Sequence, residues 1–177
     1  TSKVMDMSRM FASVGYNNNN FTLSLGNKFN TANVQRMNDM FSNTGYNSTV
    51  FTLDLGNNFN TSNVTDMTRM FDGVGYNSSN FTLNLSQFNI ANTSNLMSIF
   101  HSSGISNLIL SQGWNYSENL KTGSFASSKI KTIVDAPEAI RNYNFTLDNI
   151  NPDFIYTEAQ KTHIDGATMY RIDNSLL

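Results

Sequence analysis

The sequence contains no cysteine, few charged residues and no strong charge of either sign. Without cysteine, neither a disulfide framework nor a thiolate metal site can form, and the redox compartment is left open. Charged residues make up only 14% of the 177 residues, and the net charge is −2. Because such a chain has no field that would gather phosphates or anionic lipids, we expect neither nucleic acid nor a membrane surface as its partner.

Long apolar runs are missing as well. No run approaches the roughly 20 residues of a transmembrane helix, and the N-terminus lacks the basic and then apolar pattern of a signal peptide. We therefore expect no membrane insertion by this segment. The sequence starts without Met and inside a repeating pattern, so we expect a mature or excised piece of a longer protein.

A unit of 30 residues repeats along the chain. Each copy has a valine, a methionine, a Met-Phe pair and a Gly-Tyr-Asn triplet at matching positions, and this period indicates a solenoid, propeller or array. Three regular copies occupy residues 1–30, 31–60 and 61–89, and two eroded copies occupy 90–112 and 113–134. We predict a repeat region over 1–134, followed at 135–177 by a C-terminal cap or the start of another domain.

The first part of each unit has the apolar spacing of a helix face. Val4, Met7 and Met10 are three residues apart, which predicts one short helix per unit. The Asn-Thr pair at 30–31 suits an N-cap, and Gly15 suits the left-handed end of a helix. We assign the methionines on this stripe to the core rather than to a metal or redox site; they are Met7, Met10, Met37, Met40, Met67 and Met70.

The second part of each unit alternates apolar and polar residues. Segments 21–25, 51–55 and 81–85 have the period of two that is typical of a half-buried strand. One helix and one parallel strand per unit predict the α/β class, as a leucine-rich-repeat-like solenoid with an irregular C-terminal cap. In the last segment, Asp165-Gly166 between alternating runs indicates a hairpin.

Charges of opposite sign alternate between neighbouring units. Relative position 6 holds Asp6, Arg36 and Asp66, and relative position 9 holds Arg9, Asp39 and Arg69. If the units stack in register, each of these residues meets its opposite charge in the next unit. Exposed pairs contribute only about 0–1 kcal/mol each, so we expect them to disfavour slipped registers rather than to supply stability.

The units resemble a known repeat family. With the core FTLDLGNNFNTSNVTDMTRMF at 51–71, they are similar to the BspA-type leucine-rich repeats of bacterial surface proteins, strongly over 1–89 and weakly over 90–134. The resemblance implies an extracellular protein, either secreted or on the bacterial cell surface, that contacts host proteins or other cells. It implies no catalytic residues.

No motif for catalysis, metal or cofactor binding is present. His101 and His163 have no second ligand at metal spacing, and no calcium-loop pattern occurs. We therefore expect a protein that is not an enzyme and needs no metal or cofactor. Carbohydrate stays possible as a ligand, since Tyr16, Tyr46 and Tyr76 are periodic, although partial burial beside the turn glycines is the expected state of these rings.

The outward positions of the strands are the best candidates for binding. They form two adjacent rows of mostly short polar side chains, which lose little entropy on ordering. We predict adhesion or protein interaction through this sheet face. Ordinary solvated strand residues, and a structural spacer in a larger wall-associated protein, stay open as alternatives. The candidate residues are Thr22, Ser24, Thr52, Asp54, Thr82, Asn84, Asn107 and Ile109.

Overall fold

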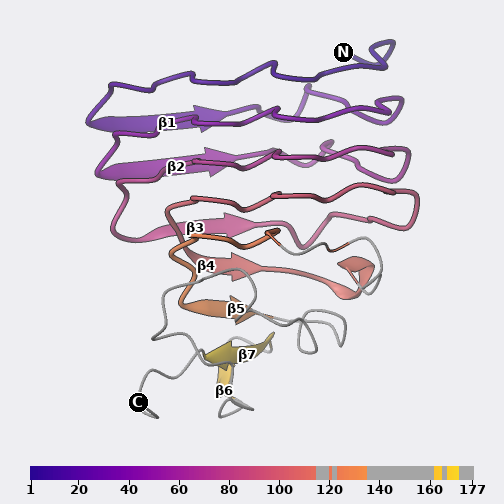
Figure 1. Cartoon of the computed structure of the whole chain (residues 1–177). Coiled ribbons are helices and arrows are strands. Elements are labelled where there is room, and N and C mark those ends of the chain that lie inside the picture. Colours follow the sequence, from indigo (N-terminus) through magenta and orange to yellow (C-terminus); the bar gives the residue numbers. More distant parts are fainter. Residues whose placement is uncertain (115–119, 121–122, 135–161, 165–166, 172–177) are drawn as a thin grey trace.

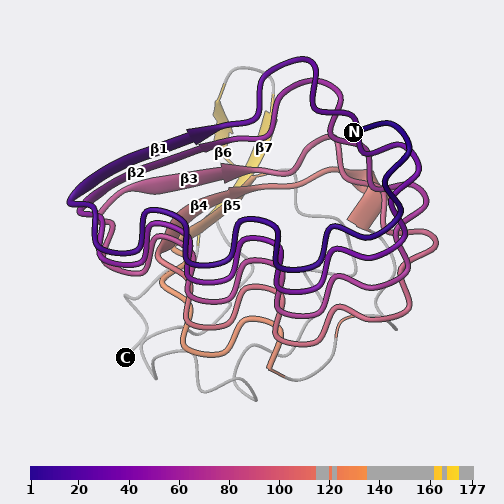
Figure 2. The same ribbon diagram turned by 90° about the horizontal axis from the view of Figure 1, so that it is seen from above.

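The chain is wound into coils that stack along one axis (Figure 1). The computed structural model describes residues 1–114, 120, 123–134, 162–164 and 167–171. Seen from above, the strands line one side of the coils and an undulating backbone lines the opposite side (Figure 2). The elements are β1 (Asn20–Ser24), β2 (Val50–Asp54), β3 (Phe81–Asn84), β4 (Ile105–Ile109), the 3-10 helix η1 (Gln112–Trp114), β5 (Thr132–Val134), β6 (Thr162–Ile164) and β7 (Ala167–Arg171).

The predicted helix in each unit is wrong, and so is the α/β leucine-rich-repeat-like solenoid that was built on it. The described residues contain no α-helix, and their one helical element is η1. The expected helices are instead runs of consecutive turns, which we call the turn segments: 8–17, 38–47 and 68–77, with shorter ones at 97–102 and 123–127.

Two alternating sets of backbone hydrogen bonds build a turn segment. In the second coil, Ser42 N donates to Asp39 O (3.0 Å) within the coil, whereas Phe41 N donates to Met70 O (2.9 Å) in the next coil. Asp39 and Asn43 have positive φ angles of 55° and 56°, which turn the chain after each short step. Every second amide is thus bonded to a neighbouring coil, and a helix ladder cannot form.

The sequence pattern misled because turns and helices share an apolar spacing of three. A stretch of about ten residues is too short for a stable isolated helix, so tertiary contacts decide its conformation. Asn and Asp tolerate the left-handed region better than most residues, and they occupy it in the second coil. The glycine prediction holds in a different setting: Gly15 and Gly45 have φ of 67° and 60° but lie within the last residues of turn segments rather than at the ends of helices.

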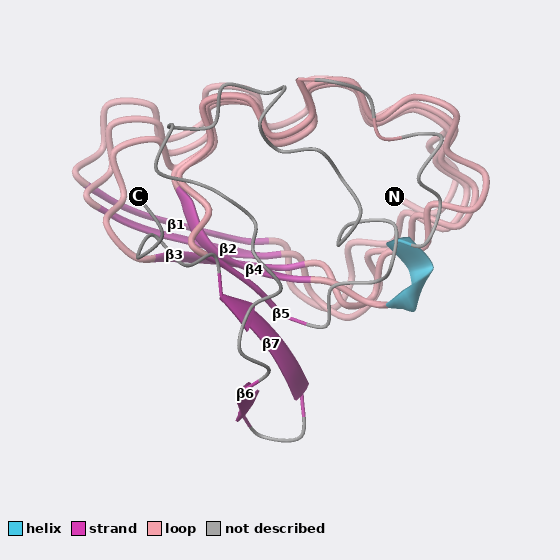
Figure 3. Ribbon diagram, turned by 60° about the horizontal axis from the view of Figure 1, so that its bottom comes forward, coloured by secondary structure: helices cyan, strands magenta, loops and turns pink. Residues whose placement is uncertain are grey.

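The three predicted strands are confirmed, but they form two sheets rather than one. β1 pairs in parallel with β2, and a separate sheet has the order β3-β4-β5-β7-β6. β3, β4 and β5 are parallel, with a register irregularity between Phe81 and Thr82. β7 pairs antiparallel with both β5 and β6, which confirms the predicted hairpin. Figure 3 shows this hairpin extending away from the coils. The rest of 135–177 lies outside the described residues.

The core consists of rows of side chains that stack from coil to coil. Phe41 lies between Phe11 and Phe71, with ring centroids 5.5 and 5.6 Å away. A second row leads from Phe59 to Phe88 and on to Trp114, which is fully buried. The predicted methionine stripe is buried at Met7, Met37, Met40, Met67 and Met70, whereas Met10, in the first coil, is 43% exposed.

The expected N-caps bind between coils instead. The hydroxyl of buried Thr31 donates to Asn60 O (2.7 Å) and accepts from Asn60 N (2.6 Å). Thr61 forms the same pair of bonds with Asn89, both at 2.9 Å. Asn60 in turn accepts from Ser62 N through its side chain (2.8 Å), which shapes a turn rather than a helix start.

The predicted charge stacking is confirmed at three pairs. Arg36 lies 3.2 Å from Asp6, and Asp39 lies 3.6 Å from both Arg9 and Arg69. Asp66 forms no ion pair with Arg36 among the described residues, although its carboxylate accepts the same two hydrogen bonds from Thr68 (2.9 and 2.6 Å) that Asp6 accepts from Ser8. The arginine side chains of these pairs are more than half exposed, so the pairs favour the 30-residue register more than they add stability.

Candidate functional site

The predicted binding residues lie on the outer side of the strands, which we call the strand face. Thr22 pairs in register with Thr52, and Ser24 pairs with Asp54. In the second sheet, Thr82 pairs with Asn107 and Asn84 with Ile109. The residues on β1, β2 and β3 are exposed, whereas Asn107 and Ile109 are half-buried. Both predicted rows therefore exist, and both are interrupted where β2 and β3 are not hydrogen-bonded to each other.

Hydrogen bonds between coils fix several side chains of the strand face. Ser24 Oγ donates to Asp54 Oδ2 (2.8 Å), and the amide of Gly56 donates to Asp54 Oδ1 (2.9 Å). The hydrogen bond from Gly56, and to a smaller extent the one from Ser24, lowers the pKa of the Asp54 carboxyl below its usual value. Farther along, Asn107 Nδ2 donates to Thr82 Oγ1 (3.2 Å).

A small hollow of about 210 Å³ opens where β2 and β3 end. Asp54 and Asn84 reach it from the strand face, and Gln87 closes part of its rim by donating to Gly56 O (3.1 Å). Asn84 is held by the amide of Ser86, which donates to its side-chain oxygen (3.0 Å). The hollow thus collects amide and carboxylate groups at the gap between the two sheets.

Sequence reasoning missed one pair on this face. Asn20 and Val50 are in register at the start of β1 and β2, and Val50 is 61% exposed. The period-two alternation, extended one residue before Phe21 and Phe51, would have found them. The strand face therefore includes an exposed apolar side chain.

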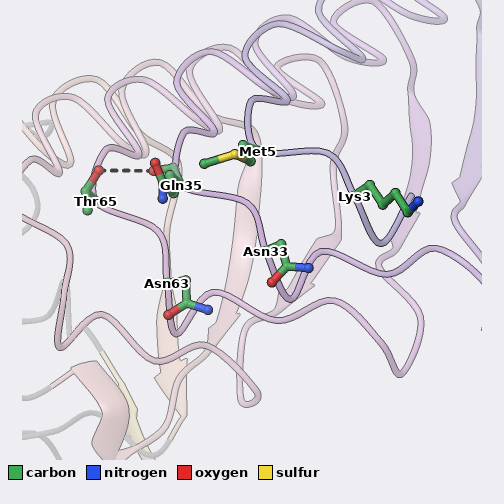
Figure 4. Close-up of a pocket in the computed structure, with 6 residues that line it drawn as sticks. All are labelled: Lys3, Met5, Asn33, Gln35, Asn63 and Thr65. Carbon is green, nitrogen blue, oxygen red and sulfur yellow. Dashed lines mark hydrogen bonds between the residues drawn. The ribbon is translucent and has the colours of Figure 1, made fainter.

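A second concave region lies at the start of the coils (Figure 4). This groove has a volume of about 670 Å³ and is lined by residues at relative positions 3 and 5 of the first three coils. The sequence did not point to it: Asn33 and Asn63 repeat in type, but the other four members differ from coil to coil. They are Lys3, Asn33 and Asn63 in one row and Met5, Gln35 and Thr65 in the other.

The three repeat tyrosines form a column. The ring centroids of Tyr16 and Tyr46 are 5.0 Å apart, and those of Tyr46 and Tyr76 are 4.9 Å apart, with nearly parallel planes. Lys129 Nζ lies 4.1 Å from the centroid of Tyr76. Burial, followed by the neighbouring tyrosines, raises the pKa of Tyr46. Tyr46 and Tyr76 are half-buried as predicted and stack on one another, whereas the prediction of partial burial is wrong for Tyr16, which is 38% exposed.

The side chain of His101 lies beside the ion pair of Arg69 and Asp72. His101 Nδ1 lies 2.9 Å from Asp72 Oδ1, while the other oxygen of Asp72 accepts a hydrogen bond from Arg69 Nη2 at 2.6 Å. In the described part of the chain, no three acidic or histidine side chains gather as possible metal ligands. The same residues include no helix long and apolar enough to cross a bilayer. The side chain of His163 lies outside the description.

Comparison with known proteins assigns the repeat sequence to a family. A family model matches residues 1–114, which cover the regular coils and reach Trp114. The chain belongs to the family described as Mycoplasma protein of unknown function, DUF285. Among curated proteins and among solved structures, no match to the chain was found. The DUF285 region contains most of the strand face and the whole groove, so both candidate sites are features of the matched segment.

Proposed function

We propose that this repeat region is a non-catalytic adhesion or protein-interaction module that binds a protein of a host or neighbouring cell through its strand face. The proposal includes an extracellular place for the module, on a bacterial cell surface or secreted. The resemblance of the units to BspA-type repeats and the low charge of the chain support this. No cofactor is part of the proposal.

The observation that supports it most is the order of the strand face before any partner binds. Ser24 and Asp54 are joined across coils at 2.8 Å, and Thr82 and Asn107 at 3.2 Å. Short side chains that are already fixed lose little conformational entropy when they bind. Exposed Val50 adds an apolar contact of the kind found in the buried centre of an interface.

The test is a triple lysine variant of the strand face. Thr52→Lys, Thr82→Lys and Asn84→Lys place three long cations on exposed positions of β2 and β3. A control with the same charge change, Ser13→Lys, Ala91→Lys and Met97→Lys, alters exposed residues outside the strands. An array of purified extracellular host proteins is screened by surface plasmon resonance with the unaltered chain and both variants.

Saturable binding that the strand-face variant loses and the control keeps would support the module. Binding that survives the strand-face variant would reject this face as the contact surface. No saturable binding to any protein of the array would favour the alternative of a structural spacer, for which the only specific support is the continuous stacking of the coils along one axis (Figure 1).

A further inference from the structure

The groove in Figure 4 is built from two rows that run along the stack, across the coils. In the first row, Asn33 Nδ2 donates to Ser2 O (2.6 Å) and Asn63 Nδ2 donates to Ala32 O (2.7 Å). Asn92 continues this row in the fourth coil, with a bond of 2.6 Å to Ser62 O. Each amide is therefore anchored through its nitrogen to the coil before it.

This anchoring leaves a row of fixed acceptors. Within the described part of the chain, the side-chain oxygens of Asn33, Asn63 and Asn92 accept no hydrogen bond, although all three residues are exposed. An amide oxygen has two lone pairs, so each can accept from a ligand. Since the nitrogen is already bonded, the orientation of each oxygen is set before binding, which lowers the entropy cost of using it.

The second row supplies chemistry of a different kind. Thr65 Oγ1 is used within the stack, where it donates to Gln35 O (3.1 Å). The side chain of Gln35 has no hydrogen-bond partner among the described residues, and Met5 is 55% exposed. Methionine is flexible and polarisable, and it is common on surfaces that bind varied apolar side chains.

Lys3 gives the groove its charge. It is exposed at the end of the asparagine row and has no ion-pair partner among the residues that the structure describes. The other lining residues are uncharged, so the groove favours a ligand with one carboxylate rather than a polyanion. It also contains no aromatic ring on which a nucleic-acid base could stack.

The length of the groove fits an extended chain. Parallel backbone hydrogen bonds join the coils, so neighbouring coils are about 4.8 Å apart. The groove from Lys3 to Asn63 therefore spans roughly 10 Å, and Asn92 extends the asparagine row beyond it to roughly 14 Å. Since an extended residue advances about 3.3 Å, that span holds about four residues. Backbone N–H groups of such a segment can donate to the asparagine oxygens, and an apolar side chain can contact Met5.

We propose that this groove is a second interaction surface, which binds an extended segment of a partner protein with an acidic side chain beside Lys3. The site is separate from the strand face and does not depend on the function proposed for that face. Its ligand is recognised by fixed amide acceptors, one exposed thioether and one ammonium group.

The test uses a displayed library of random heptapeptides, selected on the whole chain. Selected peptides are synthesised with a fluorescein label, and their affinities are measured by fluorescence anisotropy. Lys3→Glu reverses the charge in the groove, and Lys28→Glu makes the same change at an exposed lysine outside it. We expect the selected peptides to share an Asp or Glu and Lys3→Glu to weaken binding by ~10-fold, with Lys28→Glu close to the unaltered chain.

Two further variants separate this surface from the others. Met5→Ser should weaken binding a few-fold through lost apolar contact, while the triple lysine variant of the strand face should bind the peptides normally. All substitutions are at exposed positions, and thermal unfolding checks that each variant folds. The proposal is overturned if no peptide is enriched, if Lys3→Glu binds as tightly as the unaltered chain, or if both glutamate variants lose binding equally.

Discussion

The two sides of the stack are held together in different ways. On the turn side, backbone hydrogen bonds join every coil to the next: Met37 N to Asp66 O (2.9 Å), Met67 N to Asn95 O (3.0 Å) and Phe100 N to Ser124 O (2.8 Å). On the strand side, β1-β2 and β3-β4-β5 belong to separate sheets. The turn side therefore has a continuous ladder of hydrogen bonds between coils. The strand side, whose strands the sequence predicts most clearly, has a gap in its hydrogen bonding between β2 and β3.

The difference shows that a regular sequence and a continuous sheet are separate properties. The gap falls between β2 and β3, which belong to two of the regular units, whereas the eroded units pair without such a gap through β4 and β5. Continuity across the gap comes from the aromatic rows and the turn ladder, since Phe51 and Phe81 still meet with ring centroids 4.7 Å apart. Four changes would break or sharpen this comparison.

The largest effect is expected from Phe71→Ala on the turn side. Phe71 is fully buried and stacks between Phe41 and Phe100, at 5.6 and 5.9 Å, so its removal opens a cavity in the continuous part of the stack. We expect a loss of about 3–5 kcal/mol in the free energy of unfolding, measured with urea. Phe51→Ala on β2 is the matched change and should cost less, because Phe51 is 5% exposed beside the gap. An equal or larger cost for Phe51→Ala would remove the distinction between the two sides.

The next effect concerns the glycines that follow β1 and β2. Gly26 and Gly56 occupy the same repeat position with φ of 64° and 71°, so alanine is strained at both by about 1–2 kcal/mol. At Gly56 a Cβ would also overlap the carbonyl oxygen of Gly26, whereas at Gly26 it would meet open space. We expect Gly56→Ala to lower the free energy of unfolding by about 2–5 kcal/mol and Gly26→Ala by about 1–2 kcal/mol. Similar values for the two variants would mean that the coils are not packed this closely after β2.

A smaller effect is expected at the threonine that links the second and third coils. Thr31→Val keeps the shape of the side chain but removes its hydroxyl, which donates to Asn60 O and accepts from Asn60 N. Leaving these partly buried backbone groups unpaired should cost about 1–3 kcal/mol. Thr1→Val removes the equivalent bonds to Asn30 at an exposed position and should change the free energy of unfolding by less than about 0.5 kcal/mol. Urea titration of both variants measures the difference, and a neutral Thr31→Val would show that water replaces the hydroxyl.

The smallest effect is a pH dependence at the edge of the gap. The folded-state pKa of Asp54 is lowered, so its stabilising effect is present above the ordinary pKa of 3.8 and is lost as the pH falls through the folded value. The melting temperature of Asp54→Asn should therefore lie slightly below that of the unaltered chain at neutral pH and converge with it at about pH 2. Ser24→Ala should keep most of this pH dependence, since the amide of Gly56 is the larger cause. A constant difference across the pH range would refute the assignment.

The sequence predicted those parts of the fold in which a residue pattern is compatible with one kind of structure only. Alternation at 21–25, 51–55 and 81–85 allowed only strands, and charge alternation at Asp6 and Arg36 set the stacking register. The apolar stripe of the turn segments was correct about burial and wrong about conformation, because left-handed residues such as Arg69 cannot be recognised from an apolar spacing.

The candidate sites divide in the same way. The strand face followed from alternation, which fixes the outward side of each strand. The groove could not be predicted, because it depends on how far the coils are offset and on which amide atoms are already bonded within the stack. At the repeat positions of Lys3, Met5 and Gln35, the other coils have residues of different types. The repeat pattern therefore does not single these three residues out.

Because of the alternating bonds of the turn segments, we expect circular dichroism and amide hydrogen exchange to give opposite impressions of how ordered the protein is. From Asp39 to Thr49, odd-numbered amides bond to a neighbouring coil and even-numbered amides bond within their own coil, without helix or sheet over most of this length. Circular dichroism should therefore resemble that of a largely unstructured chain. Hydrogen exchange of the same sample should nevertheless find these amides slow, the odd-numbered ones opening only when two coils separate.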